Sequence, residues 1–312
     1  MQPIGIITFL AKSAGRDLAI DRGIDVAFDV IVCGSLHLDI MVKAPALPRL
    51  DETAVGSSWS RQCGGKGGNQ AVQAARAGAR TAMIGRVGAD DFGQALIDNL
   101  ARAGVDLTGV STDPHTGSGM SVAILQDDGD YGAVIVSGAN LAIDPDAIVG
   151  LWQQLGGAKV LVLQNEVPNL VNVAAAKIAA GSDAVVVFNA APARRLTDNL
   201  LDLVHVLVVN RVEAGELSGL AVHDFVSARL ALPKLQGSSR SVVVTLGGQG
   251  LLVAPVVGEV VEIAAVPVKV TSTHGAGDCF VGMLTARLAA GDSLVDGCRE
   301  ANRRAAEFVS RS

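Results

Sequence analysis

The sequence predicts a doubly wound, mostly parallel α/β fold with a small β-sheet beside it. From residue 80 onward, short runs rich in Val, Ile and Leu alternate with helical patterns. Such runs are typical of parallel strands that helices cover on both faces, and these sheets bind ligands at the carboxyl ends of their strands. Two regions, 36–60 and 119–137, are strand-like and lack helices. They predict the separate small sheet.

The elements of the main sheet follow an N-terminal stretch that has no clear pattern. We expect residues 1–28 to be either a flexible extension or an upstream start that adds little to the domain, which spans 29–312. The predicted strands are 29–34, 80–87, 159–163, 184–188, 204–209 and 241–246. The predicted helices are 91–103, 146–155, 170–180, 213–217, 279–290 and 293–308.

The small sheet is expected to form from residues 36–62 and 118–138. Segments 120–126 and 131–137, joined by Asp-Asp-Gly-Asp, predict a β-hairpin. A sheet that stands off the main domain would act as a lid that excludes water from a ligand site. The alternative is an ordinary edge extension of the main sheet.

Composition excludes several classes of partner. The net charge is −6, no Lys/Arg cluster is present and aromatic residues make up 3% of the chain, so nucleic acid is not expected as a partner. The four cysteines are widely spaced, which argues against a disulfide or zinc framework and favours a reducing cytoplasm. No apolar run reaches the length of a membrane span, so we expect a cytoplasmic protein without a membrane partner.

A run of small residues near the C-terminus carries the clearest chemical signal. Residues 272–278, Ser-Thr-His-Gly-Ala-Gly-Asp, open a predicted helix. Their backbone N–H groups can turn toward one point, and the helix start adds partial positive charge, which suits a phosphate. Asp278 would repel that phosphate if it were only structural, so we interpret it as a base for a hydroxyl that attacks the phosphate. The alternative is an ordinary helix start with Asp278 as a first-turn charge.

A second glycine-rich run, residues 64–71, reads Gly-Gly-Lys-Gly-Gly-Asn-Gln-Ala and precedes a helical pattern. Its spacing matches neither a P-loop nor a dinucleotide fingerprint. Glycines here would let the backbone approach a polyol closely, while Lys66 and Asn69 offer donors to its hydroxyls. The alternative is a flexible turn with a solvated lysine.

Polar residues also follow several of the predicted strands. Asp39 and Glu166 would offer acceptors to buried hydroxyls, or they are loop charges. Asn210 would contact phosphate or cap a helix, and Glu213 would hold magnesium through water or complete that cap. Residues 245–250, Thr-Leu-Gly-Gly-Gln-Gly, would let a nucleotide lie against the backbone or form a tight hairpin turn.

Five motifs occur in one order along the chain. They are 34–39 (Gly-Ser-Leu-His-Leu-Asp), 64–71, 189–193 (Asn-Ala-Ala-Pro-Ala), 210–213 (Asn-Arg-Val-Glu) and 275–278 (Gly-Ala-Gly-Asp). Together they closely resemble the ribokinase, or phosphofructokinase B-type, family of sugar kinases, over nearly the whole chain beyond residue 28. The resemblance implies a β-sheet lid that pairs two subunits into a homodimer, and ATP-dependent phosphorylation of the 5-hydroxyl of ribose.

The resemblance also implies roles for individual residues. Asp278 would be the catalytic base, with Gly275, Ala276 and Gly277 as the anion hole. Sugar binding would fall, beside Asp278, to His37, Asp39, Gly65, Lys66, Asn69 and Glu166. Nucleotide binding would fall to Asn210, Glu213, Thr245, Gly247, Gly250 and Gly277. ATP would be the co-substrate, and Glu213 would hold Mg²⁺ through water.

Three features depart from the family pattern. His37 stands where the family has an Asn that touches the sugar, which keeps another furanose or keto sugar, or a nucleoside, open as the acceptor. Ser272 replaces an Asp that helps to coordinate an activating potassium ion, which puts activation by K⁺ in question. The sequence ends after the helix 293–308, where the family usually continues with a loop and a final helix that shape the adenine and potassium sites, so we expect weaker nucleotide binding or a site completed differently.

Two other functional classes are weighed against the kinase. A non-catalytic sugar-binding protein would not require the intact Gly-Ala-Gly-Asp run that ends at Asp278. A Rossmann oxidoreductase would require the glycine fingerprint, which the sequence lacks.

Overall fold

The computed structural model describes residues 26–126, 131–237 and 240–311. Of the predicted extension, only residues 26–28 fall within that range, and the rest lies outside the described residues. Within the described ranges, no helix combines the length and the apolar character needed to cross a bilayer.

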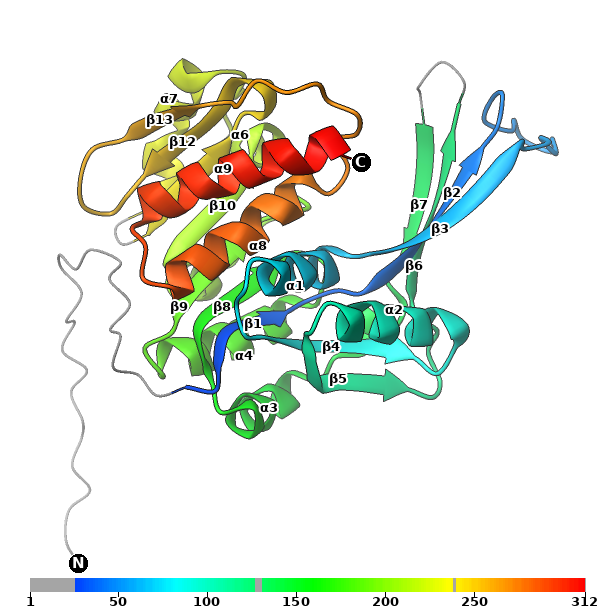
Figure 1. The fold of residues 1–312 in the computed structure, drawn as a ribbon, viewed down its shortest axis with the longest axis horizontal. Helices are drawn as coiled ribbons and strands as arrows, with labels where there is room; N and C mark the ends of the chain where they lie inside the picture. The colour runs from blue at the N-terminus through cyan, green and yellow to red at the C-terminus, as the bar shows by residue number, and fades with distance from the viewer. Residues whose placement is uncertain (1–25, 127–130, 238–239, 312) are drawn as a thin grey trace, which may run out of the picture.

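A nine-stranded sheet forms the centre of the main domain (Figure 1). In order across the sheet, the strands are β13 (Val261–Ala264), β12 (Gly250–Ala254), β11 (Ser241–Thr245), β10 (Val206–Asn210), β9 (Val185–Asn189), β8 (Ala158–Gln164), β1 (Phe28–Cys33), β4 (Thr81–Gly88) and β5 (Asp106–Asp113). The strands from β11 to β5 pair in parallel, and β12 and β13 join antiparallel at one edge. The prediction of a mostly parallel sheet is confirmed.

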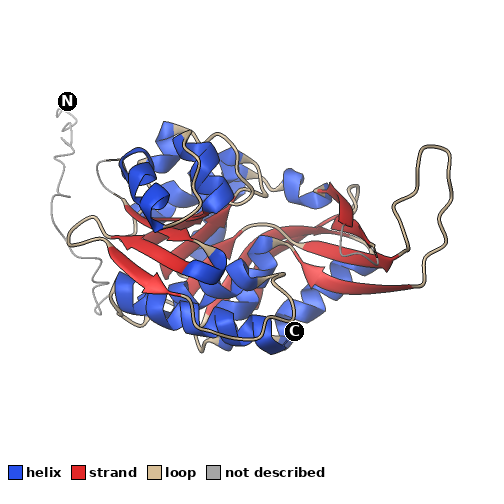
Figure 2. Ribbon diagram, turned by 90° about the horizontal axis from the view of Figure 1, so that it is seen from above, coloured by secondary structure: helices blue, strands red, loops and turns tan. Residues whose placement is uncertain are grey.

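Helices cover both faces of this sheet (Figure 2). One face carries α1 (Lys66–Arg76), α2 (Asp91–Arg102), α8 (Ala276–Ala289) and α9 (Leu294–Arg311). The other carries α3 (Ile148–Leu155), α4 (Asn169–Ala180), α5 (Asp198–Leu201), α6 (Arg211–Ser218) and α7 (Phe225–Gln236). Strand β1 shows why both faces are apolar, because Val30 and Val32 pack on the first side while Ile31 and Cys33 pack on the second.

A separate four-stranded sheet projects from the main domain (Figure 1). Its strands, in order, are β3 (Ser58–Gly64), β2 (His37–Lys43), β6 (Gly119–Leu125) and β7 (Tyr131–Val136). The hairpin pairing of β6 with β7 is confirmed by their antiparallel register, although its turn, residues 127–130, lies outside the described residues. The small sheet pairs with no strand of the main sheet in the described chain, so the alternative of an edge extension is wrong.

The strand order reverses between β1 and β8. From β1 the chain builds toward β4 and β5, whereas from β8 it builds toward β9, β10 and β11 on the opposite side. Loops that leave two adjacent parallel strands in opposite directions open a crevice at the carboxyl ends, where such sheets bind ligands. The residues that follow β1 and β8 therefore lie at the position where a ligand site is expected.

Short 3₁₀ helices link several of these elements. They are η1 (Gly138–Ala142), η2 (Pro145–Ala147) and η3 (Gly247–Gln249). Helix α3 begins at Ile148, later than predicted, because the Asp144 side chain accepts from the amide of Asp146 and starts the tighter turn η2 first.

Candidate active site

Asp278 lies in the first turn of α8, as the sequence predicted, and its side chain is buried. Gly275 is the N-cap residue, with a φ of 76° that favours glycine. A Cβ added to Gly277 would meet no atom within 4 Å, so open space lies in front of the helix start. The run therefore combines backbone N–H groups, an open approach and a buried carboxylate at one helix N-terminus.

Side-chain amides hold both carboxylate oxygens of Asp278. Asn69 Nδ2 donates to Oδ2 at 3.0 Å, and Gln70 Nε2 donates to Oδ1 at 2.9 Å. Both donors lie in the first turns of α1, which packs against α8. The predicted base is thus oriented by neutral groups, and no described residue forms an ion pair with it.

Burial raises the pKa of Asp278, because a carboxylate loses hydration inside the protein. The positive charge of Lys66 and the two amide donors act against this rise, and the charge of Glu166 adds to it. A carboxylate whose pKa lies above the usual range is a stronger base once ionised, which suits removal of a hydroxyl proton.

Gln70 links Asp278 to the ends of two central strands. Its Nε2 also lies 3.0 Å from Asn189 Oδ1, and its Oε1 accepts from Gln164 Nε2 at 2.8 Å. Gln164 is the last residue of β8 and Asn189 the last of β9. The base is therefore tied through Gln70 to the carboxyl edge of the parallel sheet.

Glu166 lies beside the switch between β1 and β8. Its Oε2 accepts from the backbone N–H of Lys66 at 2.8 Å and from the hydroxyl of Ser35. His37 Nδ1 lies 3.8 Å from the same oxygen, and His37 Nε2 is buried without a hydrogen-bond partner among the described residues. The structure thus brings together the predicted sugar-binding residues on α1, after β1 and after β8.

Asp39 reaches this region from the small sheet. Its Oδ1 accepts from the hydroxyl of Ser121 on β6, and a Cβ on Gly64 would lie 1.9 Å from its Oδ2. Only glycine at position 64 leaves room for this carboxylate. The small sheet therefore contributes Asp39 and the start of β2, while the main domain contributes Asp278.

The second glycine-rich run is a helix start and not a flexible turn. Gly65 is the N-cap of α1 with a φ of 80°, and Lys66 is already helical. A Cβ on Gly65 would lie 2.7 Å from the His37 nitrogen, and one on Gly67 would lie 2.6 Å from the Ser35 nitrogen. The glycines bring α1 against the chain between β1 and β2, and this approach positions Lys66 and Asn69.

Asn210 and Glu213 form a reciprocal cap at the start of α6. Asn210 Oδ1 accepts from the amides of Val212 and Glu213 at 2.8 and 3.0 Å. The Glu213 carboxylate accepts from the backbone N–H of Asn210 at 2.8 Å and from its Nδ2 at 2.9 Å. These hydrogen bonds form the helix cap that the sequence offered as an alternative. Burial raises the pKa of Glu213.

Residues 245–250 form the tight turn between β11 and β12. Leu246 N–H donates to the Gly250 carbonyl at 2.7 Å, and a Cβ on Gly250 would lie 2.0 Å from the Ile263 oxygen. Gly250 is thus explained by packing. Thr245 ends β11 beside Asn210, and a Cβ on Gly247 would face open space.

Ser272 lies in the loop before α8. Its hydroxyl accepts from the His274 amide at 3.2 Å, and its own N–H points to the Val309 carbonyl of α9 at 3.4 Å. No group of three or more His, Cys, Asp or Glu side chains suited to a metal ion occurs in the described part of the chain.

Several residues of the site carried no assigned role in the sequence. Gln70 and Asn189 fall inside motifs, but only the structure links them to Asp278. Gln164 could have been noticed as a polar residue that ends a buried apolar strand. Asn140 Oδ1 accepts from the Leu36 N–H, and Asn140 Nδ2 donates to the Leu36 carbonyl, at 2.8 Å each. This contact could not be predicted, because the two residues lie 104 positions apart in the sequence.

Known proteins resemble this chain over most of its length. The model of the pfkB family of carbohydrate kinases matches residues 27–312. The chain is 34% identical to the ribokinase of Lactococcus lactis over 272 residues, which cover 85% of this chain and 86% of that protein. It is 34% identical to the ribokinase of Bacillus subtilis over 281 residues, which cover 90% and 92%. The structure of Arabidopsis thaliana ribokinase complexed with ribose and ATP is similar with a TM-score of 0.84 and 27% identity, covering 90% of this chain and 92% of that one. The chain belongs to the pfkB family of carbohydrate kinases, which are phosphotransferases.

Proposed function

We propose that this protein transfers the γ-phosphoryl group of ATP to the 5-hydroxyl of D-ribose. The observation that carries the proposal is the buried Asp278 at the open N-terminus of α8, held by Asn69 and Gln70 beside the predicted sugar-binding residues. The similarity to two ribokinases, and to a ribokinase structure that contains ribose and ATP, supports this choice of substrates.

In the proposed reaction, Asp278 accepts the proton of the sugar hydroxyl as that oxygen attacks the phosphorus. The bond from the γ-phosphorus to the bridging oxygen breaks, and ADP leaves with the electron pair. The transition state is loose, so the site mainly positions the two reactants and balances charge. The N–H groups of Gly275 and Gly277 would serve the transferred phosphoryl group, and that of Ala276, which donates to the Thr273 carbonyl at 3.2 Å in this structure, would have to exchange that partner to join them.

The sugar would be held by groups of complementary hydrogen-bonding character. Asp39 and Glu166 supply acceptors for hydroxyls, while Lys66 and Asn69 supply donors. The orphaned Nε2 of buried His37 is one further group that a ligand hydroxyl would satisfy.

The residues of the proposed nucleotide site fit Mg²⁺ held through water. Mg²⁺ keeps several of its waters and binds few carboxylates, and Glu213 is a single buried carboxylate whose oxygens each accept one cap hydrogen bond. When bound, the ion would neutralise charge on the phosphates. Ser272 offers one hydroxyl that already accepts from His274, so it does not make a potassium site by itself, and no step is assigned to K⁺.

We also infer a cytoplasmic homodimer that pairs through the small sheet. Its edge strands expose large apolar side chains, with Trp59 on β3 at 68% and Val134 and Ile135 on β7 at 68% and 62%. Unpaired edges that carry apolar side chains are typical of surfaces that a partner covers. The four free cysteines suit a reducing compartment.

A coupled assay of ADP release tests the proposed substrates. Mg-ATP is supplied with ribose, deoxyribose, fructose or adenosine, each with and without K⁺. We expect turnover with ribose. The ratio of the rates with and without K⁺ shows whether the enzyme with Ser272 at this position is still activated by the cation. Turnover confined to another acceptor would keep the phosphotransfer and overturn the choice of ribose. Sugar binding without turnover on any acceptor would favour a non-catalytic protein.

A further inference from the structure

A cavity of about 430 Å³ opens on the face of the sheet that α5, α6 and α7 cover, and not beside α8. Its wall comes from β10, from the loop after β9, from α5, α6 and α7, and from the residue that precedes β11. Its volume lies in the usual range for small-molecule sites. None of the residues predicted for the sugar or the nucleotide lines it.

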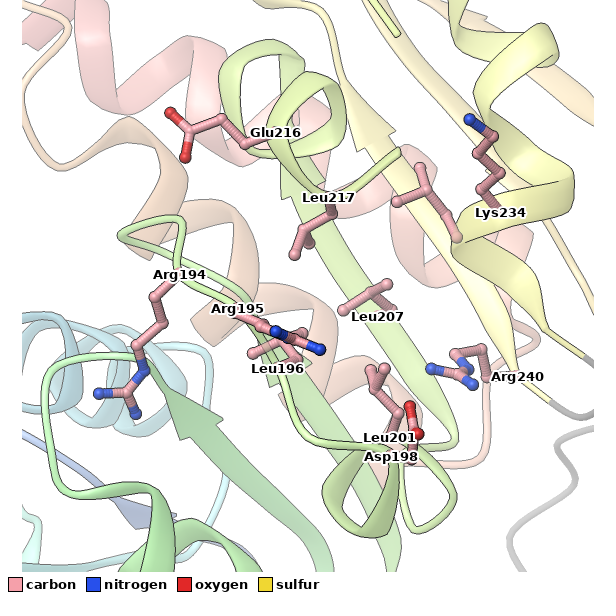
Figure 3. A pocket seen from close by; sticks show the side chains of 11 residues that line it. Arg194, Arg195, Leu196, Asp198, Leu201, Leu207, Glu216, Leu217, Lys234 and Arg240 are labelled. Atoms are coloured by element: carbon pink, nitrogen blue, oxygen red, sulfur yellow. The ribbon is translucent and has the colours of Figure 1, made fainter. Parts of the chain in front are cut away.

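Leucines and guanidinium groups share the lining. Figure 3 shows the guanidinium groups of Arg195 and Arg240 on either side of Leu207, with further leucines around them. The leucines of the lining are Leu196, Leu201, Leu207, Leu217 and Leu235. Such a mixture suits a ligand with an apolar body and one anionic group.

Arg240 carries an unsatisfied buried donor in this wall. The residue is only 8% exposed, and its buried Nε has no hydrogen-bond partner among the described residues. Burial lowers the pKa of Arg240, and the nearby carboxylates of Asp202 and Asp198 oppose that effect without forming a salt bridge to it. A buried donor without a partner is costly, and an anion that reaches this guanidinium would form charge-assisted hydrogen bonds with it.

Other charged residues of the lining, Arg194, Lys234 and Glu216, do not point into the cavity (Figure 3). Lys234 Nζ donates to the carbonyl of Ser218 at 2.8 Å, and Arg194 binds Asn165 Oδ1 and the carbonyl of Val167 at 2.9 and 2.8 Å. Figure 3 shows Arg194, Glu216 and Lys234 pointing away from the leucines. Two guanidinium groups, Arg195 and Arg240, therefore face the cavity against the single carboxylate of Asp198.

We propose that this cavity is a second binding site, for a small molecule that carries a phosphate group on an apolar body. A guanidinium group that lines a site can donate two hydrogen bonds to phosphate oxygens, and both Arg195 and Arg240 offer such donors here. The leucines of the lining would contact the remainder of the ligand. The proposed site is separate from Asp278, and its occupation does not depend on phosphotransfer.

Calorimetric titration of the full chain with phenyl phosphate and with inorganic phosphate tests this site. The proposed active site is first saturated with Mg²⁺, ribose and a non-hydrolysable ATP analogue, so that its anion-binding N–H groups do not contribute. We expect phenyl phosphate to bind, and to bind more tightly than inorganic phosphate, because only the former reaches the leucines. Equal affinities would assign the site to free phosphate and contradict the apolar part of the proposal. If neither probe binds, the proposal is overturned.

Two substitutions locate the binding. We expect Arg240→Gln and Arg195→Gln each to weaken phenyl phosphate binding by about tenfold or more, as loss of a hydrogen bond to a charged group does. Arg195 is exposed, so its replacement tests the site even if Arg240→Gln alters folding. Arg229→Gln, on α7 outside the cavity, is the matched control and should bind like the wild type. Binding that survives both cavity substitutions would contradict the proposal. Because the titration measures binding without turnover, its result can be interpreted even if the kinase assay shows no activity.

Discussion

Gln70 occupies the centre of the hydrogen-bond network around the proposed base. Its amide nitrogen faces Asp278 and Asn189, and its amide oxygen accepts from Gln164. A neutral amide can fix a carboxylate without supplying a charge that would strongly reduce its basicity. The network therefore orients Asp278 while leaving burial to raise its pKa.

Replacement of Gln70 by Leu should move the acid limb of the pH profile of kcat/KM to higher pH. The substitution removes a donor that lowers the pKa of Asp278, so the carboxylate protonates at a higher pH and activity is lost earlier as pH falls. Initial rates across the pH range measure the shift. Gln73→Leu, on the same helix, should leave the limb in place, and an unshifted limb in Gln70→Leu would contradict the proposed link.

The melting temperature of Asp278→Asn, relative to that of the wild type, should rise as the pH rises. Burial holds the folded pKa of Asp278 above its unfolded value, so the wild type loses stability as pH rises through the folded pKa. Asn cannot ionise and escapes this loss. Thermal melts at about pH 5 and about pH 8 should show a larger advantage of the variant at the higher pH. An advantage that grows toward low pH would have the wrong sign.

At the scale of elements, glycine allows the small sheet and α1 to approach the sugar-binding residues. Gly64 ends β3 directly against Asp39, and Gly65 and Gly67 bring α1 against the chain after β1. These contacts leave no space for a Cβ. The geometry of the proposed sugar site is therefore sensitive to single methyl groups.

Gly64→Ala should raise KM for ribose by about tenfold or more while affecting kcat less, because it displaces a sugar-binding carboxylate and leaves Asp278 in place. Steady-state kinetics with ribose varied at saturating ATP measure both constants. Gly150→Ala is the control, since a Cβ there meets nothing within 4 Å and Ala stabilises an exposed helix by about 1 kcal/mol. An unchanged KM in Gly64→Ala would remove Asp39 from the sugar site.

The sequence predicted the elements whose patterns are strong and missed those whose patterns are weak. The buried parallel strands were predicted with small shifts at their ends, because their apolar runs are continuous. Strand β5 was missed because it is an edge strand with few buried residues, and α7 because Pro233 lies inside it. Asp278 could be proposed from its local motif, whereas Gln164 and Asn140 act through contacts that only the fold creates.

At the scale of the whole molecule, the small sheet is exposed at both of its edges. Strand β7 exposes Val134, Ile135 and Val136 in succession, and β3 exposes Trp59. Among the described residues, the helices gather on the main sheet, and none is dedicated to covering the small sheet (Figure 2). A second copy of the chain would cover apolar surface that a lone protomer leaves in water.

Ile135→Lys should therefore weaken self-association by about tenfold or more, because it places a charge in the proposed interface. Sedimentation equilibrium of the wild type and the variant measures the association directly. Leu230→Lys replaces an equally exposed leucine, 67% accessible on α7, and should leave association unchanged. A wild type that stays monomeric at high concentration would refute the dimer.

The most direct test of the account compares wild type and Asp278→Asn in steady-state ADP release from Mg-ATP and ribose. Asp91→Asn, in the first turn of α2, serves as the matched control. We predict that Asp278→Asn loses about 10²- to 10⁴-fold in kcat, the usual contribution of a general base, while its affinity for the nucleotide, measured by calorimetry, stays close to that of the wild type. A near-wild-type rate in Asp278→Asn would contradict the assignment of Asp278 as the base and with it the proposed mechanism.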